Sequence, residues 1–383
     1  MIPYGHQWIS EEDIAAVEAV LRSDFLTQGP AIERFEAAVA EYCGAAHAVA
    51  VSSGTAALHL AGLALGLESG RLHWTVPNTF VASANCGRYA GADVNFVDID
   101  PNTYNMSVEA LAEKLERAER AGRLPTVVVP VHFGGVSCDM AAIGELSRRY
   151  RFRVIEDASH AIGGRYEGAP IGSCAHSDVA VFSFHPVKVV TTGEGGVLVT
   201  NSAEIAEYVR ALRTHGITRD LARMRGVRTG GWYYEQLYLG YNYRMTDIQA
   251  ALGASQMTRI DEFVERRNEI AARYIAALDG MPVRWQQVPE GVDSAYHLFV
   301  IELEQHRRAT VYNAMREAGI GVNVHYIPVH LQPYYIDFGF AMGMFPNAEA
   351  YYERALTLPL YPAMTDADVD TVVAALAGEV GVM

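Results

Sequence analysis

The chain has 383 residues, 50% of them hydrophobic and 20% charged, which is enough to bury a large core and to form one large domain with a smaller one beside it. Its formal net charge of −15 at pH 7 argues against nucleic acid or an anionic membrane surface as a partner. Four scattered cysteines, no basic and apolar leader at the N-terminus, and no apolar run of the roughly 20 residues that span a bilayer predict a soluble cytoplasmic protein.

The first half of the chain alternates between helical and strand patterns. Ser10 can cap a helix over 11–22, and a second helix is expected over 32–42 after the Gly29-Pro30 turn. Further strands are expected at 94–97, 126–131, 153–156 and 179–184, and helices after the turn at 53, at 108–117 and at 140–150. This alternation predicts an α/β fold with a mostly parallel sheet.

The pattern changes in the C-terminal third. Thr246-Asp-Ile-Gln249 is a capping box that opens one long amphipathic helix to about residue 278. Beyond it, strands are expected near 296–303 and 322–326, and helices near 309–317 and 347–355. We therefore expect a large domain over 1–250 and a small one over 251–383. Strand alternation in 322–327 would place Asn323, His325 and Ile327 on one face, which suits a ligand wall.

The turn Ser52-Ser-Gly-Thr-Ala-Ala-Leu58 follows a short buried strand and begins a helix. Gly54 and Thr55 would present backbone N–H groups at the helix N-terminus, which is a ready site for a phosphate. An ordinary tight turn is the alternative, and by itself the commoner one. The sequence contains neither the ATP-binding Gly-x-x-x-x-Gly-Lys-Ser/Thr loop nor a Gly-x-Gly-x-x-Gly dinucleotide fingerprint.

A carboxylate, Asp157, follows the strand at 153–156, at the edge where open α/β sheets bind ligands. For a pyridoxal-phosphate cofactor, such an aspartate keeps the pyridine nitrogen protonated and makes the ring an electron sink. A helix-capping aspartate is an equally good interpretation of Asp157 alone. For the neighbouring His160, a buried and satisfied core histidine is the default.

Lys188 lies between two apolar runs and is the only lysine or arginine between Arg165 and Arg210. A lysine with a depressed pKa facing a pocket can form a Schiff base, and its freed amine can then move protons as general acid and base. A solvated surface lysine is the usual alternative. Ser183, five residues earlier, lies near enough in sequence to reach the same phosphate. The Gly-rich stretch 191–196 is interpreted as the turn that returns the chain to the sheet.

Further motifs accompany this series of phosphate turn, aspartate and lysine. They are Ser53-Gly-Thr-Ala-Ala-Leu58, Pro77-Asn-Thr-Phe80, Glu156-Asp-Ala-Ser-His-Ala-Ile-Gly163, Ser183-Phe-His-Pro-Val-Lys188, Thr191-Thr-Gly-Glu-Gly-Gly196 and Gly240-Tyr-Asn-Tyr-Arg244. With them, from Ile2 to the last helix, the chain resembles the DegT/DnrJ/EryC1/StrS sugar aminotransferases, which are fold-type I pyridoxal-phosphate enzymes. The resemblance implies the aspartate aminotransferase-like fold: a large domain with a mostly parallel seven-stranded sheet, and a smaller α+β C-terminal domain.

Within that family, the chain is most similar to the aminotransferases of pseudaminic acid biosynthesis. The motifs concerned are Ile2-Pro-Tyr4, Asp24-Phe-Leu-Thr-Gln-Gly29, Phe184-His-Pro-Val-Lys188 and Gly321-Val-Asn-Val-His-Tyr-Ile-Pro-Val-His330. This resemblance implies transfer of an amino group from L-glutamate to a UDP-linked 4-keto-6-deoxy-N-acetylhexosamine of the L-arabino series. The product would be UDP-4-amino-4,6-dideoxy-N-acetyl-β-L-altrosamine.

The resemblance also assigns roles to individual residues. Lys188 would be the Schiff-base lysine and Asp157 the partner of the pyridinium. The cofactor would further be held by Gly54, Thr55, Phe80, His160 and Ser183, and by Asn242 of a second subunit, so that the active site would need a homodimer. The sugar nucleotide would contact Tyr4, Asp24, Phe25, Leu26, Thr27, His325, Tyr326, Ile327 and Pro328, together with Gly54, Ser183 and Asn242. Position 52 is Ser where relatives often carry Asn, a departure that should change little.

Other interpretations remain open at this point. A different nucleotide-sugar 4-aminotransferase, of the perosamine or aminoarabinose type, would use the same cofactor. A pyridoxamine-dependent sugar dehydratase would carry histidine in place of Lys188, and His185 lies three positions too early to be that substitute. A non-enzymatic ligand-sensing regulator is disfavoured by the Asp157 and Lys188 pair.

Two clusters of residues invite a separate prediction. The Arg-rich segment 213–228 could meet the diphosphate of the substrate through planar bidentate contacts, or it could be a solvated loop that balances neighbouring acids. His325 and His330 have no third ligand nearby in sequence, so we expect no metal site there.

Overall fold

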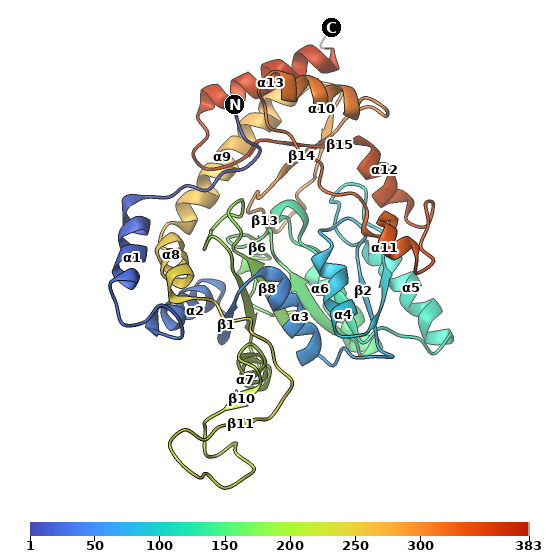
Figure 1. Ribbon diagram of the computed structural model, residues 1–383. Helices are drawn as coiled ribbons and strands as arrows, with labels where there is room; N and C mark the ends of the chain where they lie inside the picture. Colours follow the sequence, from blue (N-terminus) through green and yellow to red (C-terminus); the bar gives the residue numbers. More distant parts are fainter. Residues whose placement is uncertain (382–383) are drawn as a thin grey trace.

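The structure is a computed structural model that describes residues 1–381, and a seven-stranded sheet lies at its centre (Figure 1). In spatial order its strands are β1 (His47–Val51), β9 (Gly196–Thr200), β8 (Val179–Ser183), β5 (Arg153–Asp157), β4 (Val127–Val129), β2 (Leu72–Thr75) and β3 (Asp93–Phe96). β9 runs antiparallel to both of its neighbours, and all the other pairings are parallel. The predicted α/β fold with a mostly parallel seven-stranded sheet is confirmed.

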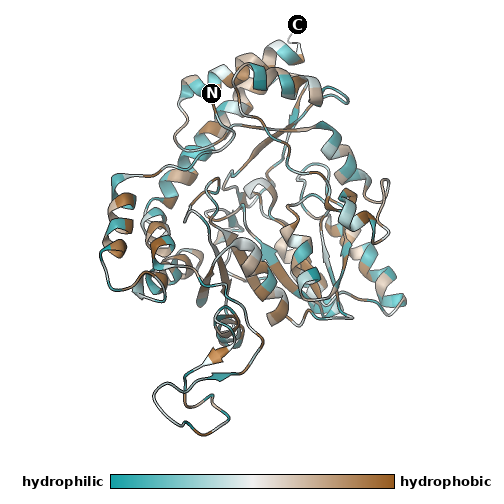
Figure 2. Cartoon of the chain, in the orientation of Figure 1, coloured by the Kyte–Doolittle hydropathy of each residue, from teal (hydrophilic) through white to brown (hydrophobic). Residues whose placement is uncertain are grey.

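Helices cover both faces of this sheet, because its strands are apolar on both sides (Figure 2). In β8, Ala180 and Phe182 pack in the cluster that includes α2 (Pro30–Cys43) and α8 (Asp247–Met257). Val179 and Val181 pack in the cluster that includes α3 (Gly54–Ala64) and α7 (Ala203–Leu212). The helices of this part are α1 (Glu11–Leu21), α2 (Pro30–Cys43), α3 (Gly54–Ala64), α4 (Ala82–Tyr89), α5 (Val108–Arg120), α6 (Met140–Tyr150), α7 (Ala203–Leu212) and the 3-10 turn η1 (Phe133–Gly135). The helices expected over 11–22, 32–42, 108–117 and 140–150 are all present, to within a few residues at their ends.

One predicted long helix is in fact two. α8 (Asp247–Met257) opens on the predicted capping box of Thr246 and Gln249, and α9 (Ile260–Leu278) begins after a break at 258–259. The break follows from a contact that the periodicity does not encode: the buried carboxylate of Asp13 accepts hydrogen bonds from Gln256 at 2.6 Å and from Arg259 at 2.8 Å. α8 therefore packs on α1 and α2, while α9 leads to the C-terminal part.

The C-terminal part is built on a separate three-stranded sheet. Its strands are β12 (Arg284–Trp285), β14 (Phe299–Glu302) and β15 (Ala355–Leu358), and its helices are α10 (Arg308–Glu317), α11 (Pro333–Ile336), α12 (Pro346–Arg354) and α13 (Asp366–Val380), with the 3-10 turn η2 (Val329–Leu331). The strand expected at 322–326 is wrong, since only Asn323 forms a bridge, to Thr357. A second three-stranded sheet joins β6 (Arg165–Tyr166), β7 (Ala169–Pro170) and β13 (Val292–Asp293). The boundary at residue 250 stays a prediction.

An arm at the N-terminus is fixed to this C-terminal part. Ile2 bridges to Ile320 and donates its N–H to the carbonyl of Gly319 at 2.9 Å. From there the arm leads to α1 (Figure 1).

A hairpin projects from the body below α7 in Figure 1. It carries β10 (Ile217–Thr218) and β11 (Glu235–Gln236) and exposes several large apolar side chains, Val227, Trp232 and Leu239 among them. The Arg-rich segment lies mostly on this hairpin, but Arg213 donates to Glu36 and to the carbonyl of Ala50 and so belongs to the body of its own chain.

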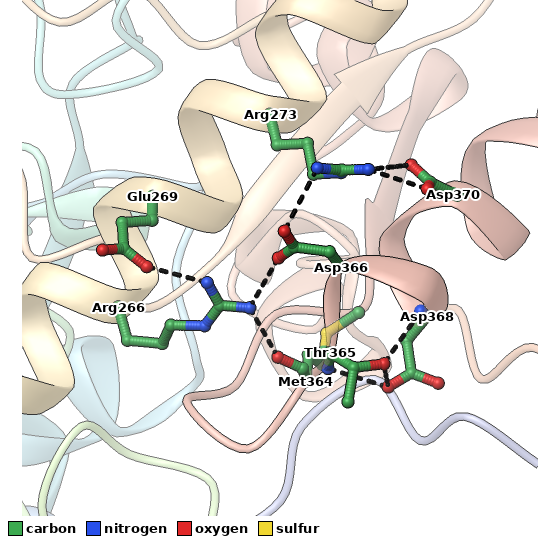
Figure 3. A network of polar contacts seen from close by, with 8 residues as sticks. All are labelled: Arg266, Glu269, Arg273, Met364, Thr365, Asp366, Asp368 and Asp370. Atoms are coloured by element: carbon green, nitrogen blue, oxygen red, sulfur yellow. Dashed lines mark hydrogen bonds and ion pairs between the residues drawn. The ribbon is translucent and has the colours of Figure 1, made fainter.

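Polar contacts fix α13 against α9 (Figure 3). Arg273 makes a bidentate contact with Asp370 at 2.7 Å, and Arg266 donates to Asp366 at 2.9 Å. The helix starts at a capping box in which Thr365 Oγ1 accepts from the N–H of Asp368, while the Asp368 carboxylate accepts from the N–H of Thr365.

Replacing Thr365 with Ala should destabilise the first turn of α13 by about 1 kcal/mol, because the cap hydrogen bond is lost. Amides of that turn should then exchange with deuterium about fivefold faster, measured by hydrogen exchange on the whole chain. Thr371→Ala is the matched control, since the Thr371 hydroxyl only bonds back to Ala367 within the same helix. Equal exchange rates in the Thr365 variant and the wild type would contradict the role of the cap.

Candidate functional site

A cavity of about 690 Å³ lies at the carboxyl ends of β1, β5 and β8. Parallel strands bring their carboxyl ends to one edge, so residues far apart in sequence meet there. The cavity is also walled by the N-terminal arm and by residues 323–326 from the C-terminal part. Of the residues predicted from the sequence, it gathers Tyr4, Gly54, Thr55, Phe80, Asp157, His160, Ser183, Lys188, Asn323, His325 and Tyr326.

The start of α3 forms one end of the cavity. Ser53 caps this helix by accepting the N–H of Ala56 at 3.1 Å, so the N–H groups of Gly54 and Thr55 are left at the open end of the helix. The turn is tightly packed: a Cβ on Gly54 would come within 2.9 Å of Ser183 Cβ, and one on Gly196 within 2.3 Å of the Ser53 carbonyl oxygen. This close approach brings Ser183 beside the helix N-terminus, where the free N–H groups could bind an anion.

Asp157 ends β5 and is buried in the floor of the cavity. Its Oδ2 accepts from Ser83 Oγ at 2.6 Å, and its Oδ1 accepts the N–H of Ser159 at 3.2 Å. Ser83 in turn lies 2.7 Å from Thr79 Oγ1. These contacts hold the carboxylate in one orientation and leave lone pairs for a group in the cavity.

Lys188 reaches the cavity from the loop between β8 and β9. Burial lowers the pKa of its amine to about 8, against the opposing pull of the nearby Asp157 carboxylate. About a tenth of such an amine is uncharged at pH 7, whereas an ordinary lysine is almost wholly protonated. A partly uncharged amine can act as a nucleophile at neutral pH, which is the role that the sequence suggested for Lys188.

Three buried histidines and a tyrosine that line the cavity are His160, His297, His325 and Tyr326. His160 accepts the N–H of Gly134 on Nδ1 at 3.3 Å, so the proton of the neutral ring is on Nε2, which lies 3.2 Å from the hydroxyl of Tyr326. Burial holds the pKa of His160 and His297 well below the ordinary histidine value and lowers that of His325 to about 3, with the Lys188 charge adding to each shift. These histidines are uncharged at neutral pH.

Some residues predicted to contact the substrate do not line this cavity. The turn at 24–27 instead packs on the start of α8, where Thr27 bridges to Thr246 and the carbonyl of Leu26 accepts the N–H of Asp247. Ile327 and Pro328 lie beyond the wall, and Ile327 is exposed. Asn242 is exposed and bridges to Thr214, outside the cavity of its own chain.

Three residues of the site were missed in the sequence. Ser83 orients Asp157, Glu194 lines the cavity mouth, and His297 lies 3.5 Å from Lys188 Nζ. No local signal in the sequence marks any of the three. His297 is a histidine just before the apolar strand β14 (Phe299–Glu302), where a core histidine is the ordinary interpretation. No spacing connects it to Lys188, because 108 residues separate them.

Residues 1–381 contain neither a cluster of metal ligands nor a helix that could span a membrane. His325 contacts Thr357 and His330 contacts Glu349, and no cluster of three or more His, Cys, Asp or Glu in residues 1–381 could hold a metal. None of the helices described is both long and apolar enough to traverse a bilayer.

The cavity thus combines helix N-terminal N–H groups that could bind an anion, a carboxylate held by hydrogen bonds, and a lysine amine with a lowered pKa. Such a set can bind a phosphorylated heteroaromatic aldehyde: the helix holds the phosphate, the carboxylate meets a ring nitrogen, and the amine meets the carbonyl.

Comparisons with known proteins bear on this site. The model of the DegT/DnrJ/EryC1/StrS aminotransferase family matches residues 7–377. The spore coat polysaccharide biosynthesis protein SpsC of Bacillus subtilis is 42% identical over 382 residues, which cover 98% of this chain and 96% of SpsC.

Two solved structures are similar over almost their whole length. Spr1654 of Streptococcus pneumoniae, described as a sugar aminotransferase, superposes in its PMP form with a TM-score of 0.90 at 30% identity, covering 98% of each chain, and is also known in a PLP form. Helicobacter pylori PseC, an aminotransferase involved in the biosynthesis of pseudoaminic acid, has a TM-score of 0.90 at 27% identity and covers 99% of each chain.

Proposed function

Because the chain belongs to the DegT/DnrJ/EryC1/StrS aminotransferase family, we propose that it is a pyridoxal-phosphate-dependent sugar aminotransferase that uses Lys188 and Asp157 as its catalytic residues. The observation that carries this proposal is their meeting in one cavity beside the N-terminus of α3, with the amine of Lys188 partly uncharged at neutral pH. The PMP and PLP forms of Spr1654 support the choice of cofactor.

The residues present fit this cofactor. The phosphate would be held by the N–H groups of Gly54 and Thr55 and by the Ser183 hydroxyl, in the tight turn that leaves no room for a Cβ at Gly54. When bound, pyridoxal phosphate supplies an aldehyde that accepts amines and a ring that withdraws electrons from the attached carbon. Asp157 would hold the proton on the ring nitrogen. His160, Tyr326 and the half-exposed Phe80 would flank the ring.

Lys188 has two tasks in this proposal. Its uncharged amine would hold the cofactor through the aldehyde carbon, with loss of water. When free, Nζ would act as the acid and base that takes up and releases a proton at the reacting carbon atoms. The low pKa suits both tasks, because the amine gains and loses a proton near neutral pH.

For the substrate, the proposal names a nucleotide-linked 4-keto-6-deoxy sugar, with glutamate as amino donor. The first candidate is the UDP-linked N-acetylhexosamine of the L-arabino series, converted to UDP-4-amino-4,6-dideoxy-N-acetyl-β-L-altrosamine. Similarity to PseC supports this choice. The higher identity to SpsC, which is named for spore coat polysaccharide, supports testing other 4-keto sugars, including the precursors of perosamine and aminoarabinose.

The proposed function is tested with purified protein, pyridoxal phosphate, glutamate and a panel of nucleotide-linked 4-keto sugars. We expect a visible absorption band on cofactor binding, and a product whose mass and C4 NMR signal show a new amine. A protein that stays colourless with added pyridoxal phosphate would refute the enzyme assignment. A product from a different keto sugar would keep the assignment and correct the substrate.

The proposal also includes a homodimer with shared active sites. Asn242 is exposed outside its own cavity, and the projecting hairpin exposes Val227 to 85%, Trp232 to 75% and Leu239 to 83%. Apolar side chains exposed together on a projecting segment suit a protein interface. A second copy of this chain would cover them and bring its Asn242 to the phosphate.

Mixed dimers test this arrangement. Asn242→Ala should weaken cofactor binding, and Lys188→Ala should be inactive. If Asn242 acts across the interface, a mixed dimer of the two variants contains one complete site, so random mixing should restore about a quarter of the wild-type activity at limiting cofactor. Mixtures that stay as inactive as the separate variants would place Asn242 in its own subunit's site or outside it.

A further inference from the structure

His297 is the residue in contact with Lys188 that the proposed chemistry leaves without a role. It lies just before β14, and its Nε2 is 3.5 Å from Lys188 Nζ, at the long end of the hydrogen-bonding range. Its ring is buried and lies 4.5 Å, between centroids, from the ring of His160. Hydrogen bonds at catalytic groups are often long before the substrate complex forms.

The other ring nitrogen of His297 decides which way this hydrogen bond runs. Nδ1 is buried and has no hydrogen-bond partner within residues 1–381. A neutral imidazole has one N–H donor and one acceptor nitrogen. A buried acceptor without a partner is tolerated better than a buried donor without one. The favoured tautomer therefore has its proton on Nε2, and Nε2–H then points at the lone pair of an uncharged Lys188 amine.

We propose that His297 is a positioning residue for Lys188. His297 donates a hydrogen bond from Nε2 to the uncharged Lys188 amine and so favours the form of the lysine that attacks the cofactor aldehyde. This inference rests on the proposed function. In addition, the hydrogen bond would orient the free Lys188 amine in the cavity before it transfers a proton.

The other titratable and charged groups around this pair are consistent with an uncharged histidine. Asp157 on β5 faces Lys188 and favours its ammonium form, so it works against His297. Burial lowers the pKa of His297, and Lys188, His160, Arg267 on α9 and His325 lower it further. Tyr326 stays neutral because burial raises its pKa. His297 is therefore too weak a base to take a proton from the Lys188 ammonium group.

The test measures how fast pyridoxal phosphate attaches to the cofactor-free protein as a function of pH, followed by the visible band. In the wild type the rate should rise with a midpoint near pH 8, the pKa to which burial lowers the Lys188 amine. His297→Phe keeps the packing but removes the donor, and the midpoint should rise by about one pH unit, which is about tenfold slower attachment at pH 7. His297→Gln keeps an N–H donor and should restore the midpoint to within a few tenths of a unit.

A matched control separates this role from packing. His59 is also a buried histidine with a pKa lowered by burial, but it lies on α3 among tyrosines and outside the cavity. His59→Phe should leave the midpoint unchanged. If His297→Phe leaves it unchanged as well, lowers it, or shifts it no more than His297→Gln does, the inference is wrong.

Nitrogen NMR of the wild type provides a measurement that does not depend on any variant. At about pH 9, where most of the Lys188 amine is uncharged, the His297 ring should show a proton on Nε2. A proton on Nδ1 at that pH would overturn the inference even if His297→Phe failed to fold. A wild type that gains no visible band would instead refute the proposed function and not this tautomer.

Discussion

Replacing Lys188 with Ala should abolish covalent attachment of pyridoxal phosphate and lower the rate of amino transfer by at least about 10⁴-fold, because one side chain supplies both the nucleophile and the proton carrier. The visible band should be absent. In the wild type, reduction with borohydride followed by proteolysis should place the added mass on the peptide that contains Lys188. Binding of the phosphate group at Gly54 and Thr55 should persist, so the variant should still retain some free cofactor.

The chain offers a matched control for this experiment in Lys114. Burial lowers its pKa to about 7, yet it donates to Asn95 at 2.7 Å, lies over the ring of Trp74 and does not line the cavity that holds Lys188. Lys114→Met keeps the apolar stem and should leave the band and the activity intact. If Lys188→Ala keeps a reducible visible band, or if Lys114→Met loses that band, then attachment of pyridoxal phosphate depends on a low lysine pKa alone and not on the cavity.

The predicted residues that do meet in the cavity each carry a local signal in the sequence. A glycine where a strand turns into a helix, an aspartate after a buried strand, and a lone lysine between two apolar runs are all visible in one dimension. The order of parallel strands then brings them to one edge of the sheet. Helix boundaries with capping boxes, such as those at Ser10 and Thr246, were also predicted, because the cap residues are within three positions of each other.

What the sequence did not predict depends on contacts between distant segments. The break between α8 and α9 follows from hydrogen bonds to Asp13, more than 240 residues away. The segment at 322–326 has the alternation of a strand, but beyond Asn323 it forms no ladder and wraps the cavity. Ser83 and His297 look like ordinary core residues until the fold brings them to Asp157 and Lys188. Their roles are visible only in three dimensions.

Asp157→Asn should lower the rate of amino transfer by about 10² to 10⁴-fold while leaving the visible band in place. The amide has almost the same shape as the carboxylate, so the cavity and Lys188 are preserved. However, it carries no negative charge to stabilise a proton on the ring nitrogen, and the ring then withdraws electrons less well. The loss should be in kcat, because the residue acts on the reacting atoms and not on the sugar nucleotide.

Ser83→Ala tests whether the orientation of that carboxylate matters as well as its charge. Removing the 2.6 Å hydrogen bond to Oδ2 leaves Asp157 charged but less fixed, so the expected loss is smaller, about tenfold. The variants should therefore rank in the order wild type, Ser83→Ala, Asp157→Asn. Full activity in Asp157→Asn with the cofactor attached would show that the ring nitrogen needs no carboxylate partner here. A larger loss in Ser83→Ala than in Asp157→Asn would mean that the serine, and not the aspartate, makes the critical contact.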